Sequence, residues 1–550
     1  MPDPATARHF GAHALLSALE SRGVRYLFGV PGHGAYPIYD AINDFPSMQA
    51  IVGRHEQGIT FAADAYAWVT NGVAVATSVP AAGLTNASTS ILEATWSQDR
   101  LLFLLEEDPM HRDVLRSIAR YYQRVDDAEE IGAGVHHLLD LLETGRPGAA
   151  VLEVPNRSLN TEVRGLPGAH RTVAATAPAS ATLVSEAAEL LSAAPRCVIV
   201  AGATAVAAGA SSAIQRLAEA LGAPVFTDNF AKGVLSQDHP LALGHSWTAN
   251  GPGEQLLRDA DLILVIGAPV AAAQNTGDWS PTMVTGSRPP EQVARQLVLV
   301  DWDDQQQGPL AARLRLQGDV PGILEAMSES VQPRGSWPFP SERLDAIRQL
   351  AWDYAAERNG WALPAFRGLR EALPRDAIVL CDSLIGIWLD WLFPAYGPRR
   401  MRFPCGTGTL GWGVPASVGA KLAAPDREVV VVAGDGAFLY NPQELATMLL
   451  YGQKVTVVIA NDNQYSAIRH NMAENFGRST CYQIVNPDFV RLGEAFGMRS
   501  IRLASSDDLG SAVAEAIAGD RSTLIDCPLE VLPPRALYDF KVGYAVPTTS

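Results

Sequence analysis

Short apolar segments alternate with helical patterns along the whole chain, and this alternation recurs in three domain-sized blocks. Tyr26–Val30 in the first block, Leu262–Ile266 in the second and Val429–Ala433 in the third are segments of this kind. Strands that alternate with helices form parallel sheets covered by helices. We therefore predict an α/β protein of three domains, each a mostly parallel sheet flanked by helices. The 550 residues suffice for three or four domains.

Two breaks in composition separate the blocks. Residues 166–181 are rich in Pro, Ala and Thr, and residues 331–340 are rich in Pro. We interpret both segments as exposed linkers. The predicted domains are therefore residues 1–165, 182–330 and 341–550.

The composition argues against several classes of partner. The chain has 42 Lys and Arg against 59 Asp and Glu and shows no basic stripe, so we expect no nucleic acid partner. No apolar run reaches the roughly 18 residues that a membrane helix needs, and the first residues do not resemble a signal peptide. Five scattered cysteines without CxxC spacing fit a reducing cytoplasm better than a disulfide scaffold or a zinc site. We expect a cytoplasmic protein without a membrane partner.

Two acidic motifs follow two neighbouring predicted strands of the third block. Gly434-Asp435-Gly436 comes directly after Val429–Ala433, and the next apolar segment leads into Asn461-Asp462-Asn463. The glycines permit a tight turn and a close approach of the backbone to a ligand. Either motif alone is more often a simple turn.

A helix is predicted between the two motifs. Asn441 would be its N-cap, Pro442 its first residue and Glu444 its capping-box acid, and Gly452 would end it. Strands joined by such a helix are parallel, so their carboxyl ends lie at one edge of the sheet, where ligands bind. Asp435 and Asp462 should therefore converge. Two carboxylates beside glycine-rich backbone suit a Mg²⁺ ion that holds a diphosphate.

This combination resembles the signature of the thiamine diphosphate-dependent enzymes of the acetolactate synthase and benzoylformate decarboxylase group. The second metal ligand of that family is usually Asn, and Asp462 stands in its place here. The resemblance implies that the main-chain carbonyl of Gln464 is the third metal ligand. It also implies cofactor contacts at Gly434, Gly436, Ala437 and Tyr465.

A segment of the first block strengthens the resemblance. RHEQGITFAADAYA, which contains Glu56, is similar to the family segment whose Glu contacts the aminopyrimidine ring of the cofactor. Without that context, Glu56 would be an ordinary acidic residue in the first turn of a helix. The resemblance implies instead that its carboxyl group shares a proton with the ring nitrogen and acts as an acid–base catalyst.

Other segments carry further implied roles. CGTGTLGWGVPASVGA resembles the segment that cradles the pyrimidine, with Gly408 as a main-chain contact and Leu410 as the wedge that bends the cofactor. Leu384 is a candidate cofactor contact, and with Ile385 and Trp388 it lines either an apolar pocket or the core. His33 lies in the loop where the family places a residue near the reactive carbon. It is a candidate for substrate binding or proton relay.

The histidine relay of benzoylformate decarboxylase is not implied, because Val79 and Gln274 occupy the corresponding positions. The acetolactate synthase pattern is also incomplete, since LLEEDPMHRD replaces its usual Gln-containing segment. The resemblance implies a 2-oxo acid substrate, with a carbon–carbon bond cleaved or formed next to its carbonyl. A decarboxylase and a carboligase both remain open.

The family's sites lie between subunits, so we expect a homodimer or homotetramer. An FAD or ADP in the central domain is a further option, and Gly202-Ala203 and Val300-Asp301 are compatible with one. Two other interpretations stay open. Residues 406–411 fit the GxGxxG pattern of a nicotinamide-dependent dehydrogenase, although the preceding RMRFPC is a poor strand. The chain could also be a non-catalytic homologue, which intact Glu56, Asp435 and Asp462 argue against.

Overall fold

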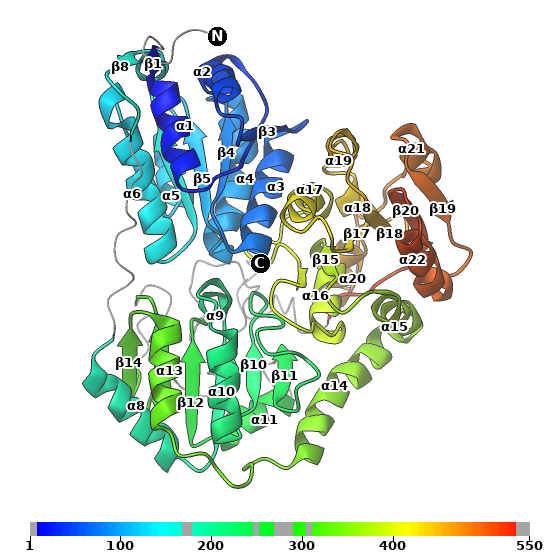
Figure 1. Ribbon diagram of the computed structural model, residues 1–550. Coiled ribbons are helices and arrows are strands. Elements are labelled where there is room, and N and C mark those ends of the chain that lie inside the picture. The colour runs from blue at the N-terminus through cyan, green and yellow to red at the C-terminus, as the bar shows by residue number, and fades with distance from the viewer. Residues whose placement is uncertain (1–7, 168–178, 246–251, 269–289, 304–310, 535–550) are drawn as a thin grey trace, which may run out of the picture.

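The computed structural model describes residues 8–167, 179–245, 252–268, 290–303 and 311–534. They form three six-stranded sheets in which all strand pairs are parallel, each flanked by helices. The predicted fold class is confirmed. Figure 1 shows the N-terminal domain (blue to cyan) above the central domain (green), with the C-terminal domain (yellow to red) beside both. Gln274 lies outside the described residues.

The N-terminal domain contains a sheet of strand order β3-β2-β4-β5-β7-β6 and a small antiparallel pair, β1 with β8. The elements are β1 His9–Phe10, α1 Gly11–Ser21, β2 Tyr26–Gly29, α2 Tyr36–Ala41, β3 Gln49–Val52, α3 Glu56–Thr70, β4 Ala74–Ser78, α4 Ala82–Ser97, β5 Leu101–Leu105, α5 Arg112–Ile118, β6 Tyr121–Arg124, α6 Ile131–Thr144, β7 Ala149–Glu153, α7 Asn156–Leu159 and β8 Glu162–Val163.

The C-terminal domain has a sheet of order β16-β15-β17-β18-β20-β19. Counted along the chain within each sheet, this order is the same as in the N-terminal domain. The elements are α14 Ser341–Asn359, α15 Leu363–Ala372, β15 Ile378–Cys381, α16 Ser383–Leu392, β16 Met401–Arg402, α17 Gly413–Ala423, β17 Val429–Gly434, α18 Asp435–Phe438, α19 Glu444–Leu450, β18 Thr456–Asn461, α20 Ser466–Phe476, α21 Phe489–Ala495, β19 Arg499–Arg502, α22 Leu509–Ala518 and β20 Thr523–Pro528.

The central sheet has a different order, β11-β10-β9-β12-β13-β14, which is the order typical of dinucleotide-binding domains. The elements are α8 Ala181–Ala193, β9 Cys197–Ala201, α9 Ala203–Ala207, α10 Ser211–Leu221, β10 Val225–Thr227, β11 Ala242–His245, α11 Pro252–Asp259, β12 Leu262–Ile266, α12 Pro290–Ala294, β13 Leu297–Asp301, β14 Leu314–Gln317 and α13 Val320–Ser330.

The central strands of each sheet are almost wholly buried, because helices cover both faces. β5, β12 and β13 have no exposed residue, and their sequences are continuous apolar runs, which is how the sequence reveals them. The strands that the sequence did not predict include β6, β11, β14, β16 and β19 at sheet edges, and also β7 inside the N-terminal sheet. Edge strands are half-exposed and polar, as in Tyr121–Arg124 and Arg499–Arg502, so they lack the apolar signal.

One local prediction holds only in part and another was wrong. The segment 331–340 is mostly exposed, but its residues Val331 and Phe339 are buried in the core of the central domain. The helix α19 begins at Glu444 and not at Pro442, although Gly452 ends it in the left-handed conformation as expected. The side chain of Asn441 does not cap the helix; it donates a hydrogen bond to the carbonyl of Gly411 at 2.9 Å.

No helix among the described residues is long and apolar enough to span a membrane.

Candidate functional site

A cavity of about 870 Å³ opens at the carboxyl edge of the C-terminal sheet. It lies between the ends of β17 and β18, the start of α16, the helix α20 and the turn before α17. All ten candidate residues that the sequence placed in this domain line it. They are Leu384, Gly408, Leu410, Gly434, Asp435, Gly436, Ala437, Asp462, Gln464 and Tyr465.

Asp435 is the first residue of α18, directly after β17, and is 3% exposed. Its Oδ1 accepts a hydrogen bond from the amide of Gly436 at 2.8 Å, and its Oδ2 accepts one from the amide of Asn463 at 2.8 Å. Asn486, which the sequence did not reveal, donates to the same Oδ2 at 2.6 Å. Burial raises the pKa of Asp435, and these donors oppose the rise.

Asp462 faces the same cavity from the loop after β18, where the amide of Gln464 donates to its Oδ1 at 3.3 Å. Burial and the nearby charge of Asp435 raise the pKa of Asp462 to about 6, and a hydrogen bond from Ser466 opposes this. The predicted convergence of the two carboxylates is confirmed. Two partly desolvated carboxylates that repel each other form a site that a divalent cation would stabilise.

The donor set suits Mg²⁺ better than a transition metal. Among the described residues, no cluster of three or more His, Cys, Asp or Glu side chains is placed to hold a metal. Asp435 and Asp462 would therefore be joined by a main-chain carbonyl such as that of Gln464 and by oxygens of the ligand. Mg²⁺ is usually bound in this way, by few carboxylates together with phosphate oxygens.

Glycines leave room for a ligand beside these carboxylates. A Cβ added at Gly434 would meet no atom within 4 Å, so this position is open toward the cavity. A Cβ at Gly436 would lie 2.4 Å from the ring of Tyr465, so the close approach of the two requires glycine. Gly408 has a φ of +64°, which favours glycine at the turn that carries Leu410. The cradle fits a diphosphate next to a metal ion.

An apolar wall lines another side of the cavity. Ile468, Met472 and Phe476 recur at four-residue spacing along α20 and line the cavity with Leu529 and Val531. The sequence analysis missed this wall, although the spacing in α20 is a recognisable helical stripe. Ile385 also lines the cavity. Trp388 is fully buried in the core, where its Nε1 donates to the carbonyl of Leu532 at 2.7 Å, and is not part of the site.

The two candidate residues of the N-terminal domain are not part of this cavity. Glu56 is the first residue of α3, and its Oε2 accepts a hydrogen bond from Nδ2 of Asn86 at 3.1 Å. His33 is exposed in the loop after β2, with Glu106 beside it, and neither lines the cavity. Burial raises the pKa of Glu106, and the charge of His33 opposes the rise. Both Glu56 and His33 lie at the carboxyl edge of their own sheet.

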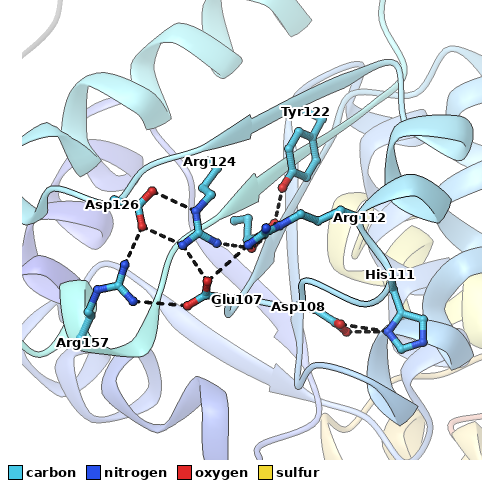
Figure 2. Close-up of polar contacts among 9 residues, drawn as sticks. Glu107, Asp108, His111, Arg112, Tyr122, Arg124, Asp126 and Arg157 are labelled. Atoms are coloured by element: carbon cyan, nitrogen blue, oxygen red, sulfur yellow. Dashed lines mark hydrogen bonds and ion pairs between the residues drawn. The ribbon is translucent and has the colours of Figure 1, made fainter.

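The same edge of the N-terminal sheet carries a network of paired charges (Figure 2). Glu153 is completely buried and accepts hydrogen bonds from Arg112 at 2.7 Å and from Arg124 at 2.6 Å. Arg124 and Arg157 in turn both pair with Asp126 at 2.7 Å. The arginine partners hold the pKa of Glu153 below its usual range against the effect of burial. Because each of these charges has a partner, the network leaves no vacant charged site.

Three family models match the chain in order. The N-terminal TPP binding domain of the thiamine pyrophosphate enzymes matches residues 10–130, the central domain residues 184–327 and the C-terminal TPP binding domain residues 384–527. The fold and the site thus define a thiamine diphosphate-dependent enzyme.

Related proteins match this chain over nearly its whole length. A probable 2-ketoarginine decarboxylase of Pseudomonas aeruginosa is 30% identical, with 93% of each chain covered. A probable acetolactate synthase large subunit of Methanocaldococcus jannaschii is 28% identical over 95% of this chain and 93% of its own. An acetolactate synthase large subunit of Lactococcus lactis is 29% identical over 94% and 92%. The chain belongs to the thiamine pyrophosphate enzyme family, and the resemblance inferred from its sequence is confirmed.

The dehydrogenase interpretation of residues 406–411 is not supported. These residues follow β16, a two-residue strand at the edge of its sheet, whereas a dinucleotide-binding loop follows a first, central strand. The loop instead carries Gly408 and Leu410 into the cavity.

Proposed function

We propose that this enzyme cleaves or forms a carbon–carbon bond next to the carbonyl group of a 2-oxo acid, as a decarboxylase or a carboligase. The observation that carries the proposal is the cavity that gathers Asp435, Asp462 and the glycine turns. When bound, thiamine diphosphate supplies the electron sink for such a step. The names of the relatives, acetolactate synthases and a 2-ketoarginine decarboxylase, support the substrate class.

Asp435, Asp462 and the main-chain carbonyl of Gln464 would hold Mg²⁺, which in turn would hold the diphosphate of the cofactor. Gly434, Gly436 and Ala437 would cradle the diphosphate, and Leu384, Gly408, Leu410 and Tyr465 would contact the rings. The apolar wall on α20 would exclude water from the reacting atoms, which strengthens every electrostatic interaction near them.

Glu56 would hold a proton on its carboxyl group opposite the aminopyrimidine ring, and His33 would relay protons to or from the substrate. Neither residue lines the cavity of its own chain. We therefore propose that the active unit is a homodimer, or a tetramer built from two such dimers, in which the N-terminal edge of one copy covers the cavity of the other.

Exposed apolar side chains at both edges support this arrangement. Tyr36, whose ring contacts that of His33, is 57% exposed, and Met110, in the loop after β5, is 85% exposed. Phe476, which lines the cavity, is 58% exposed, and Tyr440 and Val485, in loops of the same domain, are 53% and 98% exposed. Apolar surface of this kind at two functional edges is typical of an interface between subunits.

The domain limits 1–165, 182–330 and 341–550 remain our assignment, with the pyrimidine handled by the first domain and the diphosphate by the third. In the central domain, Asp301 at the end of β13 already pairs with Arg146 at 2.8 Å and with Oγ1 of Thr204 at 2.9 Å. Its Oδ2 is buried without a hydrogen-bond partner among the described residues. An FAD or ADP at this edge is the corresponding hypothesis, and a flavin would colour the purified protein yellow.

Two experiments test the proposed function. Candidate 2-oxo acids are incubated with the enzyme, thiamine diphosphate and Mg²⁺, and aldehyde, acyloin and acetolactate-type products are measured separately. Then inactive Glu56→Gln and Asp435→Ala chains are mixed under subunit exchange. Because half of the random dimers are hybrids and each hybrid has one intact site, roughly a quarter of the activity should return. No product from any 2-oxo acid, or no recovery on mixing, contradicts the corresponding proposal.

A further inference from the structure

A buried carboxylate of the N-terminal domain holds a turn of the C-terminal site. Glu93 of α4 is completely buried. Its Oε2 accepts hydrogen bonds from the amide and from Oγ1 of Thr407, both at 2.7 Å, and its Oε1 accepts one from the amide of Gly406 at 3.3 Å. A Cβ at Gly406 would lie 3.0 Å from Glu93 Oε2, so the close contact favours glycine there. The turn that Glu93 holds leads directly into Gly408 and Leu410.

A buried carboxylate of the C-terminal domain holds the turn that carries Glu56. Glu444 of α19 is 1% exposed. Its Oε1 accepts hydrogen bonds from the amides of Arg54 at 3.1 Å and His55 at 3.0 Å, and its Oε2 accepts one from Oγ1 of Thr447 at 2.6 Å. A Cβ at Gly58 would lie 2.8 Å from Glu444, so this contact also requires glycine. Burial raises the pKa of Glu444, and the amide donors oppose the rise.

A second contact lies about two helical turns from each glutamate. On α4, Asn86 donates to Glu56 at 3.1 Å, so this helix touches both the catalytic candidate and the 406–410 turn. Just after α19, the hydroxyl of Tyr451 accepts a hydrogen bond from the amide of Val52 at 2.7 Å, at the end of β3. Glu93 therefore holds the 406–410 turn from the opposite domain, and Glu444 and Tyr451 hold the turn between β3 and α3 from the opposite domain.

We propose that Glu93 and Glu444 are a reciprocal pair of positioning residues, through which each cofactor-handling domain sets the turn that carries the functional residues of the other. Glu93 places Gly408 and Leu410 in the cavity. Glu444 places Glu56 at the N-terminus of α3. This inference rests on the proposed function for its catalytic meaning, but the contacts themselves can be tested without cofactor.

Carboxylates suit this task because one carboxylate accepts several hydrogen bonds at once. Hydrogen bonds from amides to an ionised acceptor are shorter and stronger than neutral ones. A carboxylate that receives amides from a turn therefore fixes the backbone itself, whichever side chains the turn carries. A buried amide that loses its acceptor bears the full cost of desolvation, so such a turn would shift rather than stay in place.

The first test measures backbone amide hydrogen exchange in the protein without cofactor. Glu93→Leu should speed exchange at Gly406 and Thr407 by about tenfold or more and leave Arg54 and His55 unchanged. Glu444→Leu should do the reverse. The matched control is Glu153→Leu, which removes an equally buried glutamate of the N-terminal domain whose partners are Arg112, Tyr122 and Arg124 rather than either turn. The proposal is overturned if exchange at the four amides stays unchanged, or if all three variants change it equally.

Glutamine variants provide a graded rescue. The amide side chain introduced by Glu444→Gln could keep one oxygen for Arg54 and His55 and donate its NH₂ group to Thr447, so this variant should restore slow exchange. Both oxygens of Glu93 act as acceptors, so Glu93→Gln should restore only part of it. If glutamine rescues neither turn, or rescues both fully, the proposed hydrogen-bond geometry is wrong. These milder variants also cover the case in which a leucine variant fails to fold.

The second test separates the two roles with thiamine diphosphate and Mg²⁺. Glu93→Leu should weaken cofactor binding by about tenfold or more, measured by calorimetry, because it displaces the turn of the cavity. Glu444→Leu should leave the affinity within about threefold and slow hydrogen–deuterium exchange at C2 of the bound cofactor, because it displaces Glu56. If the two glutamates only stabilise the fold, each variant should reduce cofactor affinity and the C2 exchange rate together. If wild type binds no cofactor, the proposed function fails while the amide exchange result still stands.

Discussion

The N-terminal and C-terminal sheets have the same strand order, yet their carboxyl edges are built differently. The C-terminal edge gathers Asp435, Asp462 and three glycines around one cavity. The N-terminal edge presents Glu56 and His33 beside a network in which the other charges pair with one another (Figure 2). One edge is a concave binding site, and the other is a surface that carries reactive groups.

The difference shows that the strand topology determines where functional residues lie, whereas the loops determine whether they form a cavity or a surface. Parallel strands bring their carboxyl ends together in both domains, so candidate residues cluster at the same place in each. The turn at the end of β17 contains Gly434 and Gly436, and the short loop after β18 carries Asp462, which together leave space for a ligand. After β5, β6 and β7 the chain carries Arg112, Asp126 and Arg157 in turn, and their ion pairs fill that part of the N-terminal edge. The comparison predicts that the C-terminal edge anchors the cofactor and that the N-terminal edge supplies the groups that transfer protons.

The largest expected effect is at the C-terminal edge. Asp435→Ala removes a metal ligand together with its charge, so Mg²⁺-dependent affinity for thiamine diphosphate should fall on the order of 10³-fold. This exceeds the roughly 10–100-fold that loss of an outer partner of a metal site costs. Calorimetry at fixed Mg²⁺ measures it, with Asp488→Ala as an exposed control on the same domain. Unchanged affinity would remove Asp435 from the metal site.

Much of the C-terminal edge could be predicted from the sequence, because its signals are local. Gly434, Asp435 and Asp462 directly follow two apolar strands, and the connection between those strands fixes their orientation. The predicted cluster of ten lining residues needs only this rule and the family resemblance. The apolar wall of α20 was missed, although its four-residue spacing was readable.

The parts that could not be predicted depend on contacts between distant segments. In the sequence Glu93 resembles an ordinary helical glutamate and Glu444 a capping-box acid. Only the packing of α4 on the 406–410 turn and of α19 on the β3–α3 turn gives them the partners seen in the structure. Asn441 resembles an N-cap, but its Oδ1 accepts a hydrogen bond from the Gln443 side chain, while its amide group donates to the Gly411 carbonyl and the Gln57 side chain. At such positions tertiary contacts override local sequence preferences, because a buried polar group needs a hydrogen-bond partner and takes one from a neighbouring segment.

The second prediction concerns the N-terminal edge. Glu56→Gln keeps the size and one acceptor oxygen but cannot hold the carboxyl proton. Exchange of the C2 proton of bound cofactor should therefore slow on the order of 10²-fold or more. Affinity should change little, because the diphosphate anchor at Asp435 is intact, and stability should fall by only about 0.3–1 kcal/mol. Equal exchange rates at matched saturation would show that this edge carries no catalytic proton.

His33 offers a smaller test of the same edge. His33→Asn should lower turnover of 2-oxo acids about tenfold without changing cofactor affinity, since water can replace part of an exposed relay. The matched control is His13→Asn, because His13 pairs with Asp44 at 3.1 Å on α1 and touches neither edge residue. If turnover with His33→Asn equals that of the control, the chemistry of the N-terminal edge rests on Glu56 without His33.

The smallest expected effect is at Asp462, where this chain departs from the usual Asn of its family. Asp462→Asn keeps one oxygen toward the metal and removes a carboxylate that burial and Asp435 make costly to ionise, as its pKa of about 6 shows. The lost attraction for Mg²⁺ and the relieved repulsion from Asp435 act in opposite directions. Affinity for the Mg²⁺ complex of thiamine diphosphate should therefore stay within about threefold of wild type or improve. Calorimetry measures the affinity of Asp462→Asn, with Asp462→Ala as the comparison. Asp462→Ala removes the oxygen ligand entirely and should bind more weakly. A large loss in Asp462→Asn would mean that anchoring needs the charge at both positions and not only the oxygen ligand.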